Sequence, residues 1–171
     1  SGLYWQQVGA LTGKTITMGT GSYVYIAGAN NTLTLDAGTT ATGSLSFYND
    51  GSAGTAFTNQ GTLTHNLGSG SIYAFNFTNS GSITATAASY LYLGYPSAGY
   101  NTTNTGTVTS DGVNTYLYLR GNFDNNGTVT AQKIISCVAR VGERFGVRHV
   151  CEVLRGAKTE GIQRHGHDRL S

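Results

Sequence analysis

The chain has 171 residues, enough for one ordinary domain or two small ones with a core of useful size. Only 11% of the residues are charged, and there are 25 glycines but a single proline. So little charge argues against a helical bundle, whose outer faces need Glu, Lys and Arg, and the single proline argues against collagen. Because 39% of the residues are hydrophobic, the chain is able to build a core, which argues against a disordered protein.

The composition changes near residue 131. Residues 1–131 hold two basic and four acidic side chains, whereas residues 132–171 hold eight basic and four acidic ones. All 11 tyrosines lie in the first part and both cysteines lie in the second. We therefore expect two modules, residues 1–131 and residues 132–171.

Residues 51–110 contain no Asp, Glu, Lys or Arg. They are nevertheless rich in Thr, Asn, Ser and Gly, so no membrane span is expected. The chain opens Ser-Gly-Leu-Tyr, with no Met and no recognisable signal segment. These features predict a processed chain or a fragment of a longer one.

A short motif repeats through the first part. Its form is aromatic-x-Asn-x-Gly-Thr-apolar-Thr, and its asparagines follow one another after 20, 25 and 21 residues. Between the copies lie alternating runs such as Tyr90-Leu-Tyr-Leu93 and Tyr116-Leu-Tyr-Leu119, which are typical of β-strands. Asn and Gly suit the turns between strands because both tolerate positive φ. The pattern predicts a mainly β protein, a parallel β-solenoid of about six coils. An antiparallel sandwich is the alternative.

Stacked coils would align equivalent residues. The apolar residue of each copy would join one inward stack (Leu63, Ile83, Val108 and Val129). The turn asparagines would form an amide ladder along the axis (Asn59, Asn79, Asn104 and Asn125).

These repeats resemble those of bacterial surface β-helix proteins, namely autotransporter passengers and haemagglutinin-like adhesins. The resemblance covers roughly residues 10–131 and is compositional. It implies an extracellular or cell-surface structural rod, without an active site.

Nothing in the first part predicts catalysis. Its four aspartates are scattered, no acidic pair recurs at the repeat period, and the calcium-binding Gly-Gly-x-Gly-x-Asp motif is absent from the sequence. We therefore interpret Asp36, Asp50, Asp111 and Asp124 as turn residues. We expect no catalytic residue, no metal site and no cofactor.

A Thr-x-Thr element recurs about once per coil. If its middle residue points inward, two ranks of hydroxyl and methyl groups point outward, an arrangement similar to the threonine array of β-helical ice-binding proteins. The alternative interpretation is that Thr is simply the default outward residue of a solenoid because of its high strand propensity. The irregular repeat spacing favours this alternative. Regular stacking of the coils would favour the array. Its predicted members are Thr62, Thr64, Ser82, Thr84, Thr107, Thr109, Thr128 and Thr130.

Two further properties point to binding or assembly. The tyrosines of the alternating runs lie opposite the leucines, where they would form an aromatic strip that stacks on a glycan, a surface or a neighbouring chain (Tyr90, Tyr92, Tyr116 and Tyr118). The end coils of a solenoid expose strand edges, and few charges are present to block pairing with another copy. We therefore expect self-association into an oligomer or a fibre.

The second part changes character. Ile134, Ile135, Val138 and Val141 fit one helical face, and Val147, Val150, Cys151 and Leu154 fit another. This spacing predicts a short basic helical segment, which would either cap the last coil or contact an anion such as DNA. His165 and His167 are too few to predict a metal clip.

The same segment resembles the winged-helix (RQC) domain of RecQ-type DNA helicases. The resemblance rests on Glu143-Arg-Phe-Gly146, Val153-Leu-Arg-Gly156 and His165-Gly-His-Asp-Arg-Leu-Ser171, and it covers only part of that domain. It implies contact with duplex DNA, with Arg144 and Arg155 as the first residues to test. The helicase motor and its zinc site are absent from the sequence, so ATP hydrolysis is not expected.

Overall fold

The computed structural model describes residues 1–86, 88–111 and 114–129. By its internal contacts the chain divides into two compact units, Ser1–Thr128 and Val129–Ser171. Residues 132–171, where the helical segment is expected, lie outside the described residues. Within the described ranges the chain forms strands and no helix, so none of these residues belongs to a helix able to cross a membrane.

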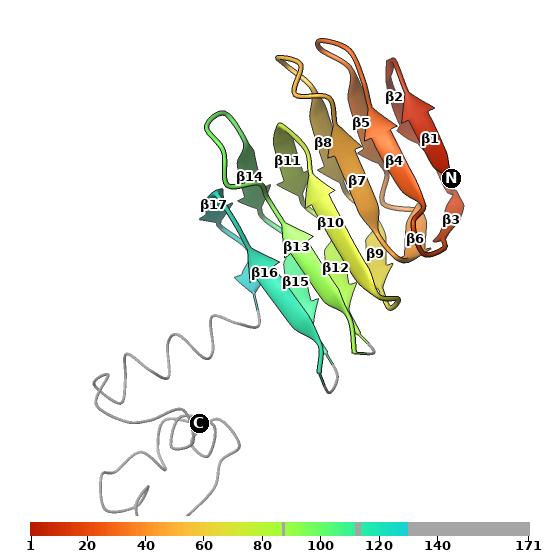
Figure 1. The fold of residues 1–171 in the computed structure, drawn as a ribbon, viewed down its shortest axis with the longest axis vertical. Coiled ribbons are helices and arrows are strands. Elements are labelled where there is room, and N and C mark those ends of the chain that lie inside the picture. Colours follow the sequence, from red (N-terminus) through yellow and green to blue (C-terminus); the bar gives the residue numbers. More distant parts are fainter. Residues whose placement is uncertain (87, 112–113, 130–171) are drawn as a thin grey trace, which may run out of the picture. The chain divides into compact units, whose positions relative to one another are not determined.

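The strands form three sheets (Figure 1). We name two of them after the tyrosines and threonines that recur on their outer faces, and the third after the asparagines that end four of its strands. The tyrosine sheet contains β1 (Gly2–Trp5), β4 (Tyr23–Ile26), β7 (Ser46–Asn49), β10 (Ser69–Tyr73), β13 (Tyr90–Leu93) and β16 (Tyr116–Leu119). The asparagine sheet contains β2 (Val8–Leu11), β5 (Thr32–Leu35), β8 (Ala56–Asn59), β11 (Asn76–Asn79), β14 (Asn101–Asn104) and β17 (Asn122–Asn125). The threonine sheet contains β3 (Thr15–Met18), β6 (Thr40–Gly43), β9 (Thr62–His65), β12 (Ser82–Ala85), β15 (Thr107–Ser110) and β18 (Thr128–Val129).

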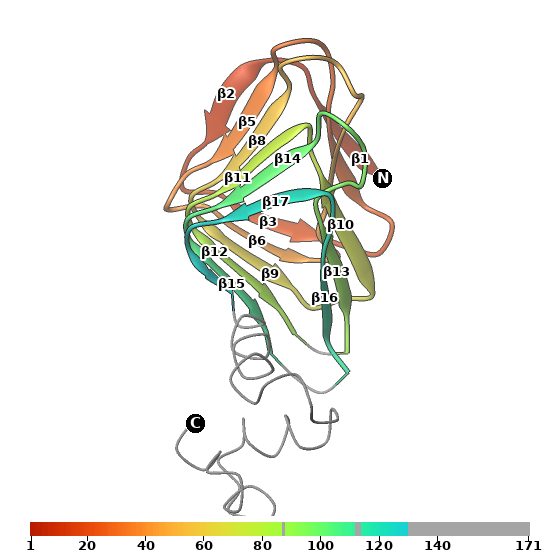
Figure 2. The ribbon, with the colours of Figure 1, turned by 90° about the vertical axis from the view of Figure 1, so that its left-hand side faces the viewer.

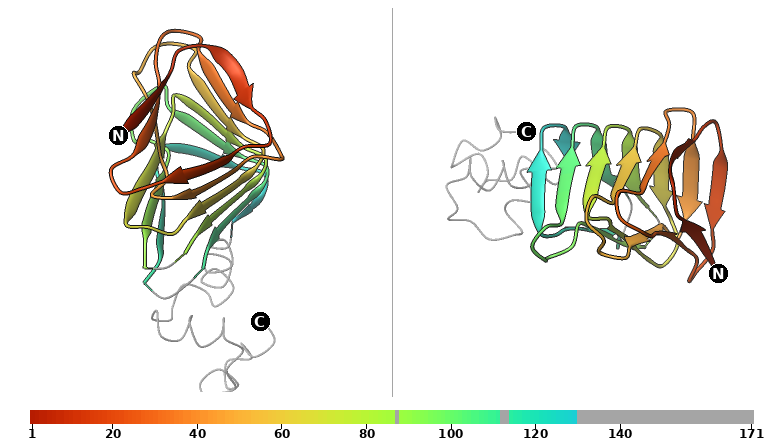
Figure 3. Two further views of the ribbon diagram at one scale, coloured as in Figure 1. Left: turned by 90° about the vertical axis from the view of Figure 1, so that its right-hand side faces the viewer. Right: turned by 90° about the horizontal axis from the view of Figure 1, so that it is seen from above.

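Each strand lies beside the strands three places before and after it in the chain, in parallel and in register. The chain therefore winds through the three sheets in turn, and Figure 2 shows the resulting three-sided outline. This confirms the predicted parallel β-solenoid and excludes the antiparallel sandwich. The right-hand view of Figure 3 shows the coils stacked one behind another.

The number of turns is smaller than expected. β1 and β16 are the first and last strands of one six-stranded sheet, so about five turns separate them. The following coil ends, among the described residues, in the two-residue strand β18. The expectation of about six coils counted the degenerate N-terminal repeats and this incomplete last one as full turns.

The alternation of apolar and polar residues along the strands determines which side chains form the core. Along most strands every second side chain is buried, and the predicted stack of Leu63, Ile83, Val108 and Val129 is at most 3% exposed. Phe47, Phe57 and Phe77 stack in the interior, with ring centroids 4.5 and 5.2 Å apart. Stacked residues of like shape leave few gaps, so the repeat itself produces a close-packed core.

Glycine was expected at the corners because it tolerates positive φ, but at the corner after the asparagine sheet the structure requires it for a different reason. The corner after the asparagine sheet contains Gly61, Gly81, Gly106 and Gly127, none of which has positive φ. A Cβ on Gly106 would lie 2.0 Å from the carbonyl oxygen of Gly81, and a Cβ on Gly81 would lie 2.1 Å from that of Gly61. Close stacking of successive corners therefore excludes a side chain.

The loops absorb the unequal spacing of the repeats. In the coils that carry the motif, the corner between the asparagine and threonine sheets is always two residues long (residues 60–61, 80–81, 105–106 and 126–127), whereas in the first two coils it is longer (residues 12–14 and 36–39). Between the tyrosine and asparagine sheets, by contrast, the connection is residues 74–75 in one coil and residues 94–100 in the next. Strands thus stay in register although the repeat length varies.

Candidate functional site

The four motif asparagines lie one above another on the inner side of the corner between the asparagine and threonine sheets, in the coils from β8 to β17. Asn59 Nδ2 donates to Asn79 Oδ1, Asn79 Nδ2 to Asn104 Oδ1, and Asn104 Nδ2 to Asn125 Oδ1, each at 2.7 Å. Asn59, Asn79 and Asn104 are fully buried. These residues end their strands and face the interior, so the ladder holds coils together and is not available to a ligand.

The ladder has a defined beginning. In the register of the asparagine sheet, Leu35 precedes Asn59, and Leu11 precedes Leu35. Asn59 Oδ1 accordingly has no hydrogen-bond partner, although it is buried. Each ladder amide also donates to the carbonyl of the glycine two residues later in its own corner, as Asn79 Nδ2 does to Gly81 O at 3.4 Å. The amides therefore connect the coils and also brace the turn.

The outer face of the threonine sheet carries two continuous ranks of hydroxyl groups. Thr15, Thr40, Thr62, Ser82 and Thr107 are register partners in one rank, and Thr17, Thr42, Thr64, Thr84 and Thr109 are partners in the other. Thr128 lies on the adjoining strand β18, whereas Thr130 lies outside the described residues. All outward positions of β3, β6, β9, β12, β15 and β18 are therefore Thr, except Ser82.

The other two sheets differ in composition. The outward positions of the asparagine sheet are mixed: they include Thr32, Thr34, Thr58, Thr78 and Thr103, but also Val8, Ala56, Asn76, Asn101 and Asp124. Thr is therefore common on both sheets, and it is nearly uniform only on the threonine sheet. Sequence analysis missed Thr40 and Thr42 because Ala41 is a weak strand signal, although the Thr-x-Thr spacing marks them.

All 11 tyrosines of the chain lie on the tyrosine sheet or on the loop 94–100 that follows β13. The predicted pairs are stacked, with ring centroids 5.1 Å apart for Tyr90 and Tyr116 and 4.7 Å apart for Tyr92 and Tyr118. The structure also contains a second row of tyrosines. The sequence analysis did not predict it, because its members come from several different repeats. In this row Tyr4 contacts Tyr25, Tyr48 contacts Tyr73, and Tyr73 contacts Tyr95, at centroid distances of 5.6, 5.9 and 5.3 Å.

One cation is associated with this sheet. The Arg120 guanidinium lies 4.2 Å from the centre of the Tyr92 ring, 5.8 Å from that of Tyr118, and donates to the Tyr73 hydroxyl at 3.5 Å. It therefore joins both rows of tyrosines at the last strands of the sheet. Such a contact is attractive because the ring face is electron-rich.

Two of the four aspartates predicted to be turn residues, Asp36 and Asp50, brace corners. For Asp124 the prediction is wrong, because it lies within strand β17 on the exposed face. Asp36 Oδ1 accepts hydrogen bonds from Thr39 Oγ1 at 2.7 Å and from Gly13 N at 3.1 Å, and these bonds lower the pKa of its carboxyl. Gly28 N donates to Asp50 Oδ2 at 2.7 Å and Ser52 N to Oδ1 at 2.9 Å, which lowers the pKa of Asp50. No group of three or more potential metal-binding side chains occurs among the residues that the structure describes.

His65 is the last residue of strand β9 in the threonine sheet, and its side chain is buried. Its Nδ1 accepts a hydrogen bond from Leu45 N at 3.1 Å, which leaves Nε2 to donate to Gly68 O at 3.2 Å. Burial lowers the pKa of the imidazole, so the neutral ring is favoured. It joins two connections of the solenoid and has no acidic partner that would make it a catalytic base.

Comparison with known proteins concerns the C-terminal part. Residues 124–171 match the RQC domain family. The ATP-dependent DNA helicase RecQ of Pasteurella multocida (strain Pm70) is 44% identical over 46 residues, which are 27% of this chain and 7% of the helicase. The chain thus matches only a small part of that helicase's length. No solved structure matches the chain.

These matches confirm the resemblance predicted for the C-terminal segment. The match begins at Asp124, so it overlaps the last coil of the solenoid at β17 and β18. Arg144 and Arg155, the predicted DNA contacts, lie within the matched segment and outside the described residues.

The ladder generates a stability prediction. In Asn79→Ala, Asn59 loses an acceptor and Asn104 a donor inside the core, so the free energy of unfolding should fall by about 2–4 kcal/mol. Urea denaturation of the full chain measures this loss. The matched control is Asn101→Ala, because Asn101 accepts from Asn122 Nδ2 at the same 2.7 Å but on the exposed face. That change should cost less than about 0.5 kcal/mol. Equal losses in the two variants would contradict a structural role for the buried ladder.

Proposed function

We propose that this chain is a structural and adhesive β-solenoid of the bacterial cell surface or extracellular space, without catalytic activity, that associates with itself. The observation that carries the proposal is the nature of its surface. Asp124 is the one acidic or basic residue within strands β1–β18. The tyrosine and threonine sheets instead present repeated rows of one kind of uncharged side chain. Such a surface suits extended contact with a regular partner better than chemistry at one point.

The tyrosine sheet is the proposed adhesive face. Its exposed rings include Tyr4, Tyr90, Tyr95, Tyr116 and Tyr118, each at least 38% exposed. A phenol ring offers an apolar surface and a hydroxyl, the combination that contacts a sugar ring. The strands of this sheet carry no charged residue, and the cation on its face, Arg120, is already engaged by Tyr92, Tyr118 and the Tyr73 hydroxyl. We therefore propose a neutral polysaccharide as the ligand.

Adsorption to insoluble cellulose and chitin tests the adhesive role. The paired variant Tyr90→Ser/Tyr116→Ser should reduce adsorption about tenfold, because each aromatic contact contributes about 0.5–1.5 kcal/mol. The matched control is Asn101→Ser/Asn122→Ser. It changes exposed side chains in the same two coils, but on the asparagine sheet, and should adsorb like the wild type. Failure of the wild type to adsorb, or an equal loss in both variants, would count against this role.

Duplex DNA binding is the alternative function, and the RQC match supports it. The matched segment is basic, and its relative is a DNA helicase. Phosphate contacts by Arg144 and Arg155 would make binding weaken with salt.

Fluorescence anisotropy with a labelled duplex tests this alternative. It predicts salt-sensitive binding that Arg144→Ala or Arg155→Ala weakens about tenfold, whereas Arg120→Ala on the solenoid leaves it unchanged. Absence of binding at low salt would exclude the alternative.

Ice binding by the threonine sheet is the third candidate. The irregular repeat spacing argued against it, but the loops absorb that irregularity, and the hydroxyl ranks remain in register from β3 to β15. Their spacing along the axis is therefore the strand spacing, about 4.8 Å.

Thermal hysteresis of the full chain tests this candidate. A bulky ring in the middle of the array, Thr84→Tyr, should abolish hysteresis. Thr78→Tyr, which places the same ring on the asparagine sheet of the same coil, should leave it intact. A wild-type protein without hysteresis would exclude ice binding.

A further inference from the structure

Two phenol rings from neighbouring coils stand side by side on the tyrosine sheet. Tyr90 begins β13 and Tyr116 begins β16, and the two residues are register partners in these adjacent strands (Figure 1). Their rings are stacked, with centroids 5.1 Å apart and planes inclined by 9°. Tyr90 is 42% exposed and Tyr116 is 44% exposed. Two phenols are thus held together while both remain in contact with solvent.

This pair differs from the second stacked pair of the sheet. Tyr92 and Tyr118 are also register partners, with ring centroids 4.7 Å apart. The Arg120 guanidinium covers them, at 4.2 Å from the centre of the Tyr92 ring and 5.8 Å from that of Tyr118. This contact holds the second pair in its stacked arrangement. The pair of Tyr90 and Tyr116 stands outside it, so these two rings are the freer ones.

The solenoid lacks the side chain that usually joins parts of a protein by oxidation. Residues 1–131 contain no cysteine, because both cysteines of the chain lie further on. A disulfide, the common cross-link of extracellular proteins, is therefore unavailable between the coils of this part. Phenol rings also join to one another when they are oxidised, and here two of them are already in contact.

The spacing of the strands suits a bond between the two rings. In a phenoxyl radical the unpaired electron is shared between the oxygen and the ring carbons beside it, Cε1 and Cε2. Neighbouring strands lie about 4.8 Å apart, which is more than the width of a phenol ring. When both rings turn about the Cβ–Cγ bond until they lie edge to edge, a Cε atom of one faces a Cε atom of the other at close range. Exposed side chains make such turns rapidly.

The geometry points to an oxidative cross-link between Tyr90 and Tyr116, a dityrosine that joins the coil of β13 to the coil of β16. The oxidant is hydrogen peroxide, acting through a haem peroxidase. Each phenol gives up its hydroxyl hydrogen as an electron and a proton, and the two radicals form a Cε–Cε bond. Each ring then transfers its Cε hydrogen as a proton to the phenol oxygen, so both phenols are restored. The two hydrogens removed reduce one molecule of hydrogen peroxide to two molecules of water.

The stacked arrangement favours this bond over competing ones. Two radicals must meet, and partners held side by side react as if each were present at a very high local concentration. Tyr116 also lies near Tyr118 on its own strand, but the centroids of those rings are 6.5 Å apart. Register partners are closer together than residues two apart along one strand. The bond therefore forms between coils of one chain.

The cross-link closes a loop in the chain. The residues between the two partners, 91–115, include the long connection 94–100. Closing a loop restricts the unfolded chain, as a disulfide does, so the cross-linked protein should unfold at a higher urea concentration than the untreated protein. This modification goes beyond the proposed function and does not depend on what the tyrosine sheet adheres to.

Oxidation of the dilute full chain with hydrogen peroxide and a peroxidase tests the inference. Cleavage on the N-terminal side of aspartate then separates residues 50–110, which contain Tyr90, from residues 111–123, which contain Tyr116. Monomers of the treated wild type should yield these two fragments joined, with dityrosine fluorescence and a mass two hydrogens below the sum of the fragments. The joined fraction should stay constant on dilution.

Phenylalanine variants locate the bond. Tyr116→Phe keeps a stacked ring but cannot form a phenoxyl radical, so nearly all of the joined product should be lost. The matched control is Tyr118→Phe, which removes the other phenol hydroxyl of the same strand and should leave the joined fraction unchanged.

Several results would overturn the cross-link. These are separate fragments after treatment, joined fragments in dimers only, a product that Tyr116→Phe leaves intact, and an equal loss in Tyr116→Phe and Tyr118→Phe. None of them bears on the adhesive role, because adsorption to polysaccharide is measured on the untreated protein.

Discussion

Register between successive coils is the constraint on which this structure depends. Each strand pairs in parallel with the strand one turn later, so a residue is always covered by its equivalent in the next coil. Residues that interact well with their own kind are therefore favoured at each position: amides in the corner, leucines and phenylalanines inside, threonines and tyrosines outside. The Asn59–Asn125 ladder is the clearest example, because an amide is both a donor and an acceptor and so satisfies its own copy at 2.7 Å.

The same constraint explains where variation is accepted. A glycine is needed at the inner corner, since a Cβ on Gly81 or Gly106 would meet the carbonyl of the corner before it. Insertions occur instead in the connections that leave the tyrosine sheet, as in residues 94–100. This division leaves the threonine and asparagine sheets regular, and it gathers aromatic loop residues such as Tyr95 and Tyr100 beside the tyrosine sheet, where their rings lie 5.0 Å apart.

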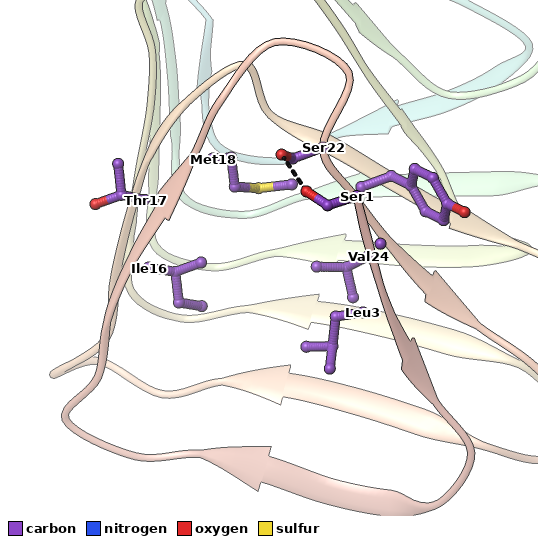
Figure 4. A pocket seen from close by; sticks show the side chains of 9 residues that line it. Ser1, Leu3, Ile16, Thr17, Met18, Ser22 and Val24 are labelled. Carbon is purple, nitrogen blue, oxygen red and sulfur yellow. Dashed lines mark hydrogen bonds between the residues drawn. The ribbon is translucent and has the colours of Figure 1, made fainter.

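Register also connects the fold with the proposed function. A stack of equivalent residues gives the tyrosine and threonine faces one chemistry along their length, which suits a polymer, a lattice or another copy of the chain. Its cost is that an inward side chain is buried only where another coil covers it. Leu3 is 49% exposed, whereas its register partner Val24 in the next coil is 4% exposed (Figure 4).

By itself the sequence determined the parallel solenoid, the inward stack of Leu63, Ile83, Val108 and Val129, and the order of the asparagine ladder, because period-two alternation and a recurring motif are local signals. The resemblance of the C-terminal segment to the RQC domain also follows from the sequence, because the motifs that carry it are specific. The tertiary structure alone decided which threonines share a face: Thr32 and Thr34 lie on the asparagine sheet, while Thr40 and Thr42 complete the threonine sheet. It alone joined tyrosines from different coils into rows. The placement of these threonines and tyrosines depends on the length of the loops between strands. The packing of one coil on another determines where each loop ends and the next strand begins.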